Sequence, residues 1–94
     1  MAADDIWLSP FFGREGVAIS VHQHIGQPYL ELFAKAETIL QRRGGRPHWA
    51  KLHSLGRDQL AALYPFWEDF CDLRARLDPE GKFLNPYLKR LFCP

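Results

Sequence analysis

The sequence predicts a small α+β fold, in which a few antiparallel strands accompany two main helices and a short C-terminal helix. Residues 17–24, VAISVHQH, alternate between apolar and polar side chains, a pattern typical of a half-buried strand. Two longer segments, 28–43 and 65–77, instead repeat apolar residues at helical spacing. With 94 residues, the chain has room for one domain and not for two.

The predicted strand at 17–24 needs a partner, and the sequence leaves that partner open. The extended stretches near Trp7 and His48 could pair with it, or strands from another segment or a second chain could do so. A strand without a partner would leave an exposed edge. This need is one reason to expect self-association.

The helix at 28–43 carries signals at both ends. Its proline lies in the first turn, where the missing N–H would have no partner in any case. Arg42 and Arg43 place positive charge in the last turn, which suits the helix dipole, and the glycines at 44–45 can form a left-handed cap. Arg46 completes a basic trio that this helix end explains.

The second half of the chain predicts three shorter helical elements. Asp58 is expected to cap the first, and Pro65 to begin the second, which reaches residue 77. Residues 78–81, DPEG, form a turn sequence, and 85–86 read as the cap and first residue of the last helix. The inward face of the helix at 65–77 is expected to consist of Phe66, Phe70, Leu73 and Leu77.

Composition excludes several classes of function. Hydrophobic residues make up 47% and aromatic residues 14% of the chain, which is a globular composition with more apolar surface than so short a chain easily covers. A formal net charge of +1 gives no field for nucleic acid, so no nucleic-acid partner is expected. Cys71 and Cys93 suggest free thiols, and without an apolar signal segment the chain is expected to be cytoplasmic, with peripheral membrane association left open.

One motif is specific. The segment RPHWAK at 46–51 resembles the C-terminal His-Trp-x-Lys motif of the sugar-lactone and alditol oxidases, FAD-linked enzymes of the vanillyl-alcohol oxidase group. This family includes D-arabinono-1,4-lactone, L-gulono-1,4-lactone and alditol oxidases. Other stretches resemble its closing segment in the same order, namely residues 4–10, 21–24, 64–65, 77–81, 83–85 and 87–88. The resemblance implies that 1–94 is a single C-terminal segment from the substrate (cap) domain, without the flavin-binding domain.

The resemblance also implies where the cofactor would be. The family carries FAD on an N-terminal domain, usually attached to a histidine in a Gly-rich motif, and its catalytic Glu-x-Arg pair would fall just before Ala2. FAD is therefore expected in the full-length enzyme and not on this chain. In the family the motif lysine lies near substrate and flavin, which implies a catalytic role for Lys51. Taken alone, Lys51 would be read as a solvated surface lysine.

Three histidines are candidate substrate ligands. The family lines its pocket with polar residues of the segment that matches 20–24, which implies roles for His22 and His24, while His48 stands beside Lys51. Alditol oxidases carry a hydroxyl residue where His24 stands. Two histidines two residues apart could also bind a metal, but no third ligand is suggested nearby, so no metal site is expected.

Two functions remain open at this point. The chain is either the C-terminal portion of an FAD-dependent oxidoreductase that oxidises a sugar 1,4-lactone, of the D-arabinono-1,4-lactone type, or an alditol, or it is a non-catalytic fragment without flavin. In the first case its partners are the flavin-binding domain and a sugar lactone or polyol. In isolation a homodimer is expected.

Overall fold

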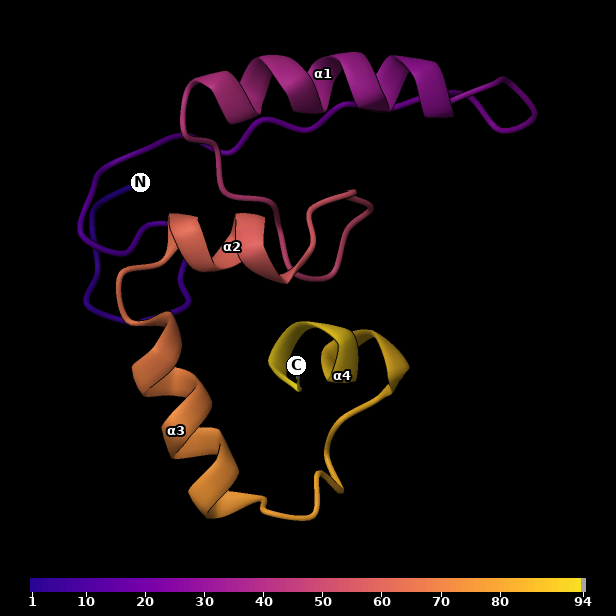
Figure 1. Cartoon of the computed structure of the whole chain (residues 1–94). Helices are drawn as coiled ribbons and strands as arrows, with labels where there is room; N and C mark the ends of the chain where they lie inside the picture. Colours follow the sequence, from indigo (N-terminus) through magenta and orange to yellow (C-terminus); the bar gives the residue numbers. More distant parts are fainter. Residues whose placement is uncertain (94) are drawn as a thin grey trace.

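Helices form the regular structure of the chain in the computed structural model, which describes residues 1–93. Their bounds are Leu30–Arg42 for α1, Arg57–Leu63 for α2, Trp67–Leu77 for α3 and Pro86–Phe92 for α4. Helices α2, α3 and α4 lie together, whereas α1 and the extended chain before it run side by side as a separate arm (Figure 1). The arm is defined here as residues 17–42.

The prediction of an α+β fold with antiparallel strands is wrong. Residues 1–93 contain no strand, and their only bridge is an isolated parallel pair between Asp4 and Phe12. Residues 17–23 are extended, but no backbone hydrogen bond joins them to another described residue. Val17 and Ile19 are 78% and 61% exposed. Alternating side chains favour a strand only where a neighbouring backbone completes the ladder.

The stretches considered as partners are occupied by turns. Near Trp7, Ser9 N–H donates to the Ile6 carbonyl over 2.9 Å, and a further turn closes at Phe12. Near His48, the Lys51 N–H donates to the His48 carbonyl over 3.1 Å. Both segments therefore bend where a partner strand would have to run straight.

The helices themselves were predicted well because their signals are local. The Asn85 carboxamide caps α4, as predicted, by accepting from Leu88 N–H over 2.8 Å. The first helix begins at Leu30 and α3 begins at Trp67, so Pro28 and Pro65 precede these helices and do not stand in their first turns as predicted. The predicted cap of α2 is wrong. Gly56 stands at that position, and its N–H donates to the Gln59 side chain over 3.0 Å, so Asp58 lies inside the first turn.

The inward face of α3 agrees with the prediction at Phe70, which packs against the core, and differs from it at both ends of the helix. Trp67 is its buried residue, at 2% exposure, whereas Phe66 is 40% and Leu77 is 77% exposed. The helix begins at Trp67, so Phe66 precedes it and turns to stack on Trp7, with ring centroids 5.6 Å apart. Trp67, the first residue of the helix, takes the inward position that was predicted for Phe66.

An aromatic core joins α2, α3 and α4. The Trp49 ring stacks on Tyr64 at 5.6 Å and lies 6.4 Å from Trp67, which stacks on Phe92 at 5.0 Å. Offset rings at these separations contribute beyond the area that they bury. Trp49 is thus a packing residue. The buried set consists of Leu55, Leu60, Tyr64, Trp67, Leu91 and Phe92.

One arginine ties the N-terminal turns to this core. The Arg46 guanidinium donates to the Leu63 carbonyl over 3.0 Å, to Phe12 over 2.8 Å and to Pro10 over 3.3 Å. The same group lies 5.0 Å from the centroid of the Tyr64 ring. A planar cation with several fixed donors suits such a junction better than lysine would. Arg46 therefore connects the start of the chain, the end of α2 and the core.

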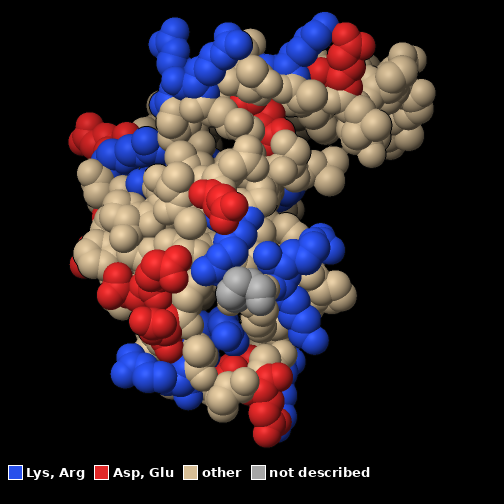
Figure 2. All heavy atoms as spheres, in the orientation of Figure 1, with Lys and Arg blue, Asp and Glu red and all other residues tan. Residues whose placement is uncertain are grey.

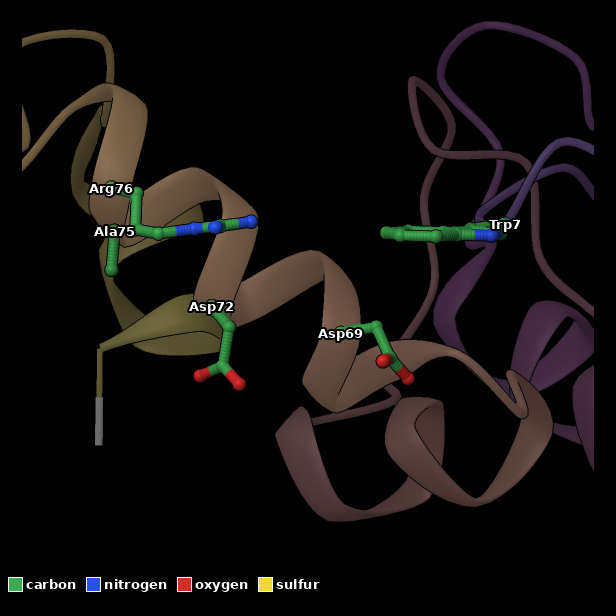
Figure 3. Close-up of a pocket in the computed structure, with 5 residues that line it drawn as sticks. All are labelled: Trp7, Asp69, Asp72, Ala75 and Arg76. Carbon is green, nitrogen blue, oxygen red and sulfur yellow. The ribbon is translucent and has the colours of Figure 1, made fainter.

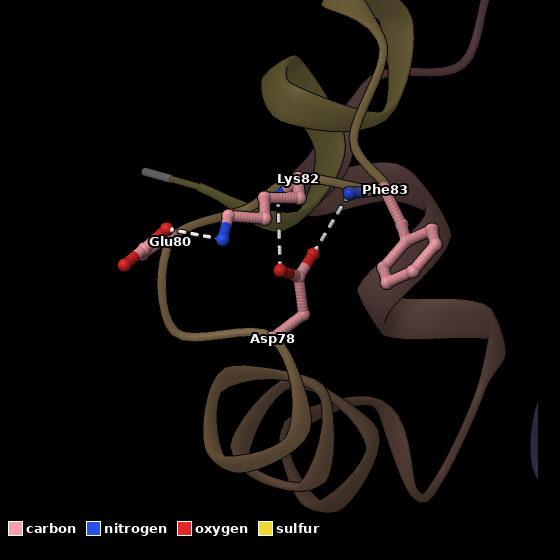
Figure 4. Close-up of polar contacts among 4 residues, drawn as sticks. All are labelled: Asp78, Glu80, Lys82 and Phe83. Carbon is pink, nitrogen blue, oxygen red and sulfur yellow. Dashed lines mark hydrogen bonds and ion pairs between the residues drawn. The ribbon is translucent and has the colours of Figure 1, made fainter.

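The turn predicted at residues 78–81 is confirmed, and a carboxylate organises it. Asp78 accepts from Lys82 N–H over 2.8 Å and from Phe83 N–H over 3.0 Å, while Glu80 pairs with Lys82 over 2.9 Å (Figure 4). Gly81 has φ +66°, which glycine adopts without strain. This turn leads from α3 to α4.

We expect Arg46→Ala to lower the free energy of unfolding by about 2 kcal/mol, because three hydrogen bonds and a ring contact are lost together. Denaturant unfolding followed by tryptophan fluorescence measures the change. Arg43→Ala is the matched control, since Arg43 is exposed and should change stability by less than about 0.5 kcal/mol. Equal effects of the two substitutions would contradict the role given to Arg46.

Acid should weaken the Asp78 turn. The backbone donors of Phe83 and then Lys82 lower the pKa of Asp78 below its ordinary value. Its contribution to folding is therefore present above the unfolded-state pKa of about 4 and is lost as pH falls through the lower folded-state pKa. The melting temperature of the wild type should exceed that of Asp78→Asn near neutral pH, and the difference should shrink below about pH 4. Asp5→Asn, at an exposed site, is the control, and a difference for Asp78→Asn that persists to about pH 2 would refute the prediction.

Candidate functional site

Lys51 closes a tight turn that starts at His48. The Lys51 N–H donates to the His48 carbonyl over 3.1 Å, and the Ala50 N–H donates to His48 Nδ1 over 3.0 Å. Because Nδ1 accepts, the neutral His48 ring carries its proton on Nε2. Within the turn Trp49 points inward, and its indole N–H donates to the Leu8 carbonyl over 2.8 Å. The lysine motif thus has one side chain in the core and its neighbours at the surface.

The Lys51 side chain is exposed and has no ion-pair partner among residues 1–93. His48 is exposed as well. A lysine held by a turn and free of carboxylates keeps its full charge available to an outside group. The geometry therefore permits Lys51 to meet an anionic or electron-rich ligand.

The chain just after Lys51 is tied to two helices. His53 Nε2 lies 2.7 Å from the hydroxyl of Tyr87 in α4. The next residue, Ser54, donates its N–H and its hydroxyl to the Glu37 carboxylate of α1 over 2.8 and 2.6 Å. Burial raises the pKa of Tyr87. Sequence reasoning missed these residues because each contact joins positions far apart in the chain, and no local pattern marks them.

A hollow of about 770 Å³ lies between the arm and the loop that contains Lys51 and Leu52, here called the Lys51 loop. It is lined by His24, the turn at 25–28, the first turn of α1 and Leu52. The turn is fixed by the Gln23 side-chain amide, which donates to the Pro28 carbonyl over 3.2 Å. Two of the predicted regions, His24 and the immediate neighbour of Lys51, therefore meet at one surface depression.

The other predicted ligands are placed differently. His22 and His48 do not line this hollow, and both are exposed. Among residues 1–93 no three histidine, cysteine, aspartate or glutamate side chains gather as a metal site. Of the three candidate histidines, His24 lines the hollow, whereas His48 belongs to the Lys51 turn itself.

A second hollow, of about 620 Å³, lies against α3 and contains none of the predicted site residues. Trp7 and Arg76 extend toward each other across it, with Asp69 and Asp72 along the helix (Figure 3). On the face shown in Figure 2, acidic and basic side chains are interspersed rather than gathered by sign. None of the helices within residues 1–93 has the length and apolar character needed to span a bilayer.

Comparison with known proteins identifies the family. The family model described as "D-arabinono-1,4-lactone oxidase" matches residues 1–91. L-gulonolactone oxidase of Mus musculus is 43% identical over 93 residues, which cover 95% of this chain and 21% of that protein. L-gulono-1,4-lactone dehydrogenase of Mycobacterium tuberculosis (strain ATCC 25618 / H37Rv) is 41% identical over 93 residues, covering 99% of this chain and 22% of the relative.

Alditol oxidase of Streptomyces sp. is 36% identical over 92 residues, covering 97% of this chain and 22% of the relative. The chain thus spans about a fifth of the length of the curated relatives that it matches. The family match extends over nearly all of the chain, with relatives of this similarity along the same length. The chain therefore belongs to the D-arabinono-1,4-lactone oxidase family.

Proposed function

We propose that this chain supplies the substrate-side part of an FAD-dependent oxidoreductase that oxidises a sugar 1,4-lactone or an alditol, with Lys51 as a catalytic residue. The observation that carries the proposal is an exposed ammonium without an ion-pair partner among residues 1–93, held on a turn beside the hollow that contains His24. The family supports the substrate class. Because the chain covers about a fifth of its relatives, the activity is proposed for the protein as a whole.

The residues present fit one side of a flavin site. The Lys51 ammonium suits an electron-rich ring edge or a substrate oxygen, since no carboxylate within residues 1–93 pairs with it. In contrast, residues 1–93 hold no strand followed by a Gly-rich turn and a helix, the arrangement that cradles a dinucleotide pyrophosphate. We therefore assign pyrophosphate binding to a separate flavin-binding domain and one contact near the ring to Lys51.

The proposed role of Lys51 in the reaction is electrostatic. A flavin held by the rest of the protein would supply the acceptor for the hydride of the substrate C–H bond. The Lys51 ammonium would stabilise the negative charge that develops on the oxygen of that carbon as the hydroxyl proton passes to a base supplied by another part of the protein. His24 can donate to or accept from another substrate hydroxyl, and His22 and His48 remain proposed ligands at the edge of the site. Fixing Lys51 before the reaction spares the cost of ordering it during the reaction.

In the flavin-containing protein, Lys51→Ala should slow flavin reduction by substrate about a hundredfold or more, the scale of a lost electrostatic donor. Stopped-flow absorbance of the flavin measures the rate. Lys89→Ala is the matched control, because Lys89 is an exposed lysine of α4 away from the hollow and should leave the rate unchanged. A rate for Lys51→Ala within a few-fold of the wild type would remove Lys51 from the mechanism.

A second candidate function is a non-catalytic module that self-associates without flavin. The exposed apolar side chains of the arm and of the neighbouring loop favour it, since Ile25 is fully exposed and Leu30 and Leu52 are each 75% exposed. Trp67 and Phe92 lie in the chain's own core and are not available for such contacts. A homodimer through the arm would cover this surface.

The isolated chain should then scatter light as a colourless particle of twice the chain mass. Ile19→Lys should shift it to the monomer, because it places a charge among apolar contacts, whereas Leu77→Lys, at a similarly exposed site on α3, should leave the dimer intact. A compact monomer at micromolar concentration, with unfolding independent of concentration, would exclude the dimer. Flavin bound at near one per chain would exclude the non-catalytic function.

A further inference from the structure

We infer that Tyr87 and Glu37 are positioning residues that fix the Lys51 turn through His53 and Ser54. This inference rests on the proposed function, because it assigns these residues a role in presenting Lys51. Their contacts come from two different helices, one from α4 and one from α1. Together the two contacts hold the backbone immediately beyond the lysine.

The contact with α4 is specific in geometry. The Tyr87 hydroxyl lies 2.7 Å from His53 Nε2, and the two rings meet edge to face at 70° with centroids 6.0 Å apart. The other nitrogen of the imidazole, Nδ1, is buried without a hydrogen-bond partner among residues 1–93. An unsatisfied buried nitrogen disfavours this placement of the ring. The bond to Tyr87 and the ring contact must offset that cost, so the hydroxyl is the polar group that holds His53.

Helix α4, which carries Tyr87, is itself held in place by packing and hydrogen bonds. Leu91 and Phe92 are buried at 3% and 7% exposure, and the Arg57 guanidinium donates to the Leu91 carbonyl over 2.8 Å. The Asn85 cap closes the first turn of the helix, in which Tyr87 stands. A side chain on a packed and capped helix transmits a fixed position to whatever it binds.

The contact with α1 complements the first. Both oxygens of the Glu37 carboxylate are used, one by the Ser54 N–H and one by its hydroxyl. Two bonds to one carboxylate define direction as well as distance, and hydrogen bonds to an ionised acceptor are stronger than neutral ones. The Tyr87 and Glu37 contacts act on adjacent residues, so the backbone at 53–54 is held between α4 and α1.

The backbone on both sides of Lys51 is therefore held by hydrogen bonds to other parts of the chain. Two residues before it, the Trp49 indole is bonded to the Leu8 carbonyl inside the aromatic core, and two residues after it His53 is bonded to Tyr87. The exposed side chain retains its own rotamers, but the backbone from which it projects is fixed on both sides. A backbone fixed in this way reduces the conformational entropy that is lost when Lys51 takes up the geometry of the reaction.

Hydrogen exchange tests the structural half of the inference. Tyr87→Phe removes one oxygen and keeps the ring, so the amides of Ala50 and Lys51 should exchange about fivefold to tenfold faster, as after loss of one hydrogen bond. Glu37→Gln should have a similar effect. Glu80→Gln is the matched control, since Glu80 pairs with Lys82 in a distant turn and should leave both amides unchanged. Unchanged exchange in both Tyr87→Phe and Glu37→Gln would overturn the inference.

Kinetics in the flavin-containing protein test the functional half. Tyr87→Phe should slow flavin reduction by about tenfold while the melting temperature stays within a few degrees of the wild type. In a Lys51→Ala background the same substitution should have no further effect, because a positioning residue acts through the group that it positions. An equal loss in both backgrounds would mean a general structural role and would overturn the inference.

His53 provides a rescue test. His53→Gln can still place a polar nitrogen near the Tyr87 hydroxyl and should retain most of the reduction rate, whereas His53→Ala should lose as much as Tyr87→Phe. Equal losses in the two variants would count against positioning through this bond. Failure of the proposed function is seen separately, as a Lys51→Ala protein that reduces its flavin at the wild-type rate, and that result would overturn the functional half even if exchange becomes faster.

Discussion

The guanidinium of Arg46 is the junction on which the rest of the fold depends. It is partly buried and pairs with no carboxylate among residues 1–93, and burial, followed by the nearby charge of Arg14, lowers its pKa. A cation taken from water in this way must find other acceptors. It finds them in three carbonyls, from two turns at the start of the chain and from the end of α2, and in the face of Tyr64. Together with the hydrogen bond from Trp49 to the Leu8 carbonyl, this side chain closes the start of the chain onto the core.

From this junction the chain leads directly to the candidate site. Three residues after Arg46, Trp49 enters the aromatic core and stacks on the same Tyr64 that faces the guanidinium. Two residues later Lys51 points outward, because the tight turn from His48 reverses the chain there. The motif that suggested a lysine site is therefore also a packing motif. Its arginine and tryptophan build the core, and its lysine is left at the surface as a consequence.

The sequence predicted the helices because caps, prolines and apolar spacing act within a few residues. The prediction of a strand at 17–24 was wrong because strand pairing depends on a second segment, which no local pattern supplies. On α3 the prediction was right for Phe70 and wrong for Phe66, since the turn before Trp67 decides which side chain faces inward at the start of the helix. Arg46 was interpreted as part of a basic helix end, yet its contacts lie up to 36 positions away. His53 and its partner Tyr87, 34 positions apart, were invisible for the same reason.

The two halves of the candidate site differ in what determines their positions. The Lys51 turn is fixed by contacts within the chain, through the core before it and through α4 and α1 after it. His24 belongs to an arm in which α1 has no buried residue and the extended segment has no paired backbone. Its position relative to Lys51 is therefore set by the turn at 25–28, by the contact of Glu37 in α1 with Ser54, and by whatever covers the arm. On this basis the contacts within the chain fix the backbone that carries the proposed catalytic charge, whereas the placement of His24 depends on the arm.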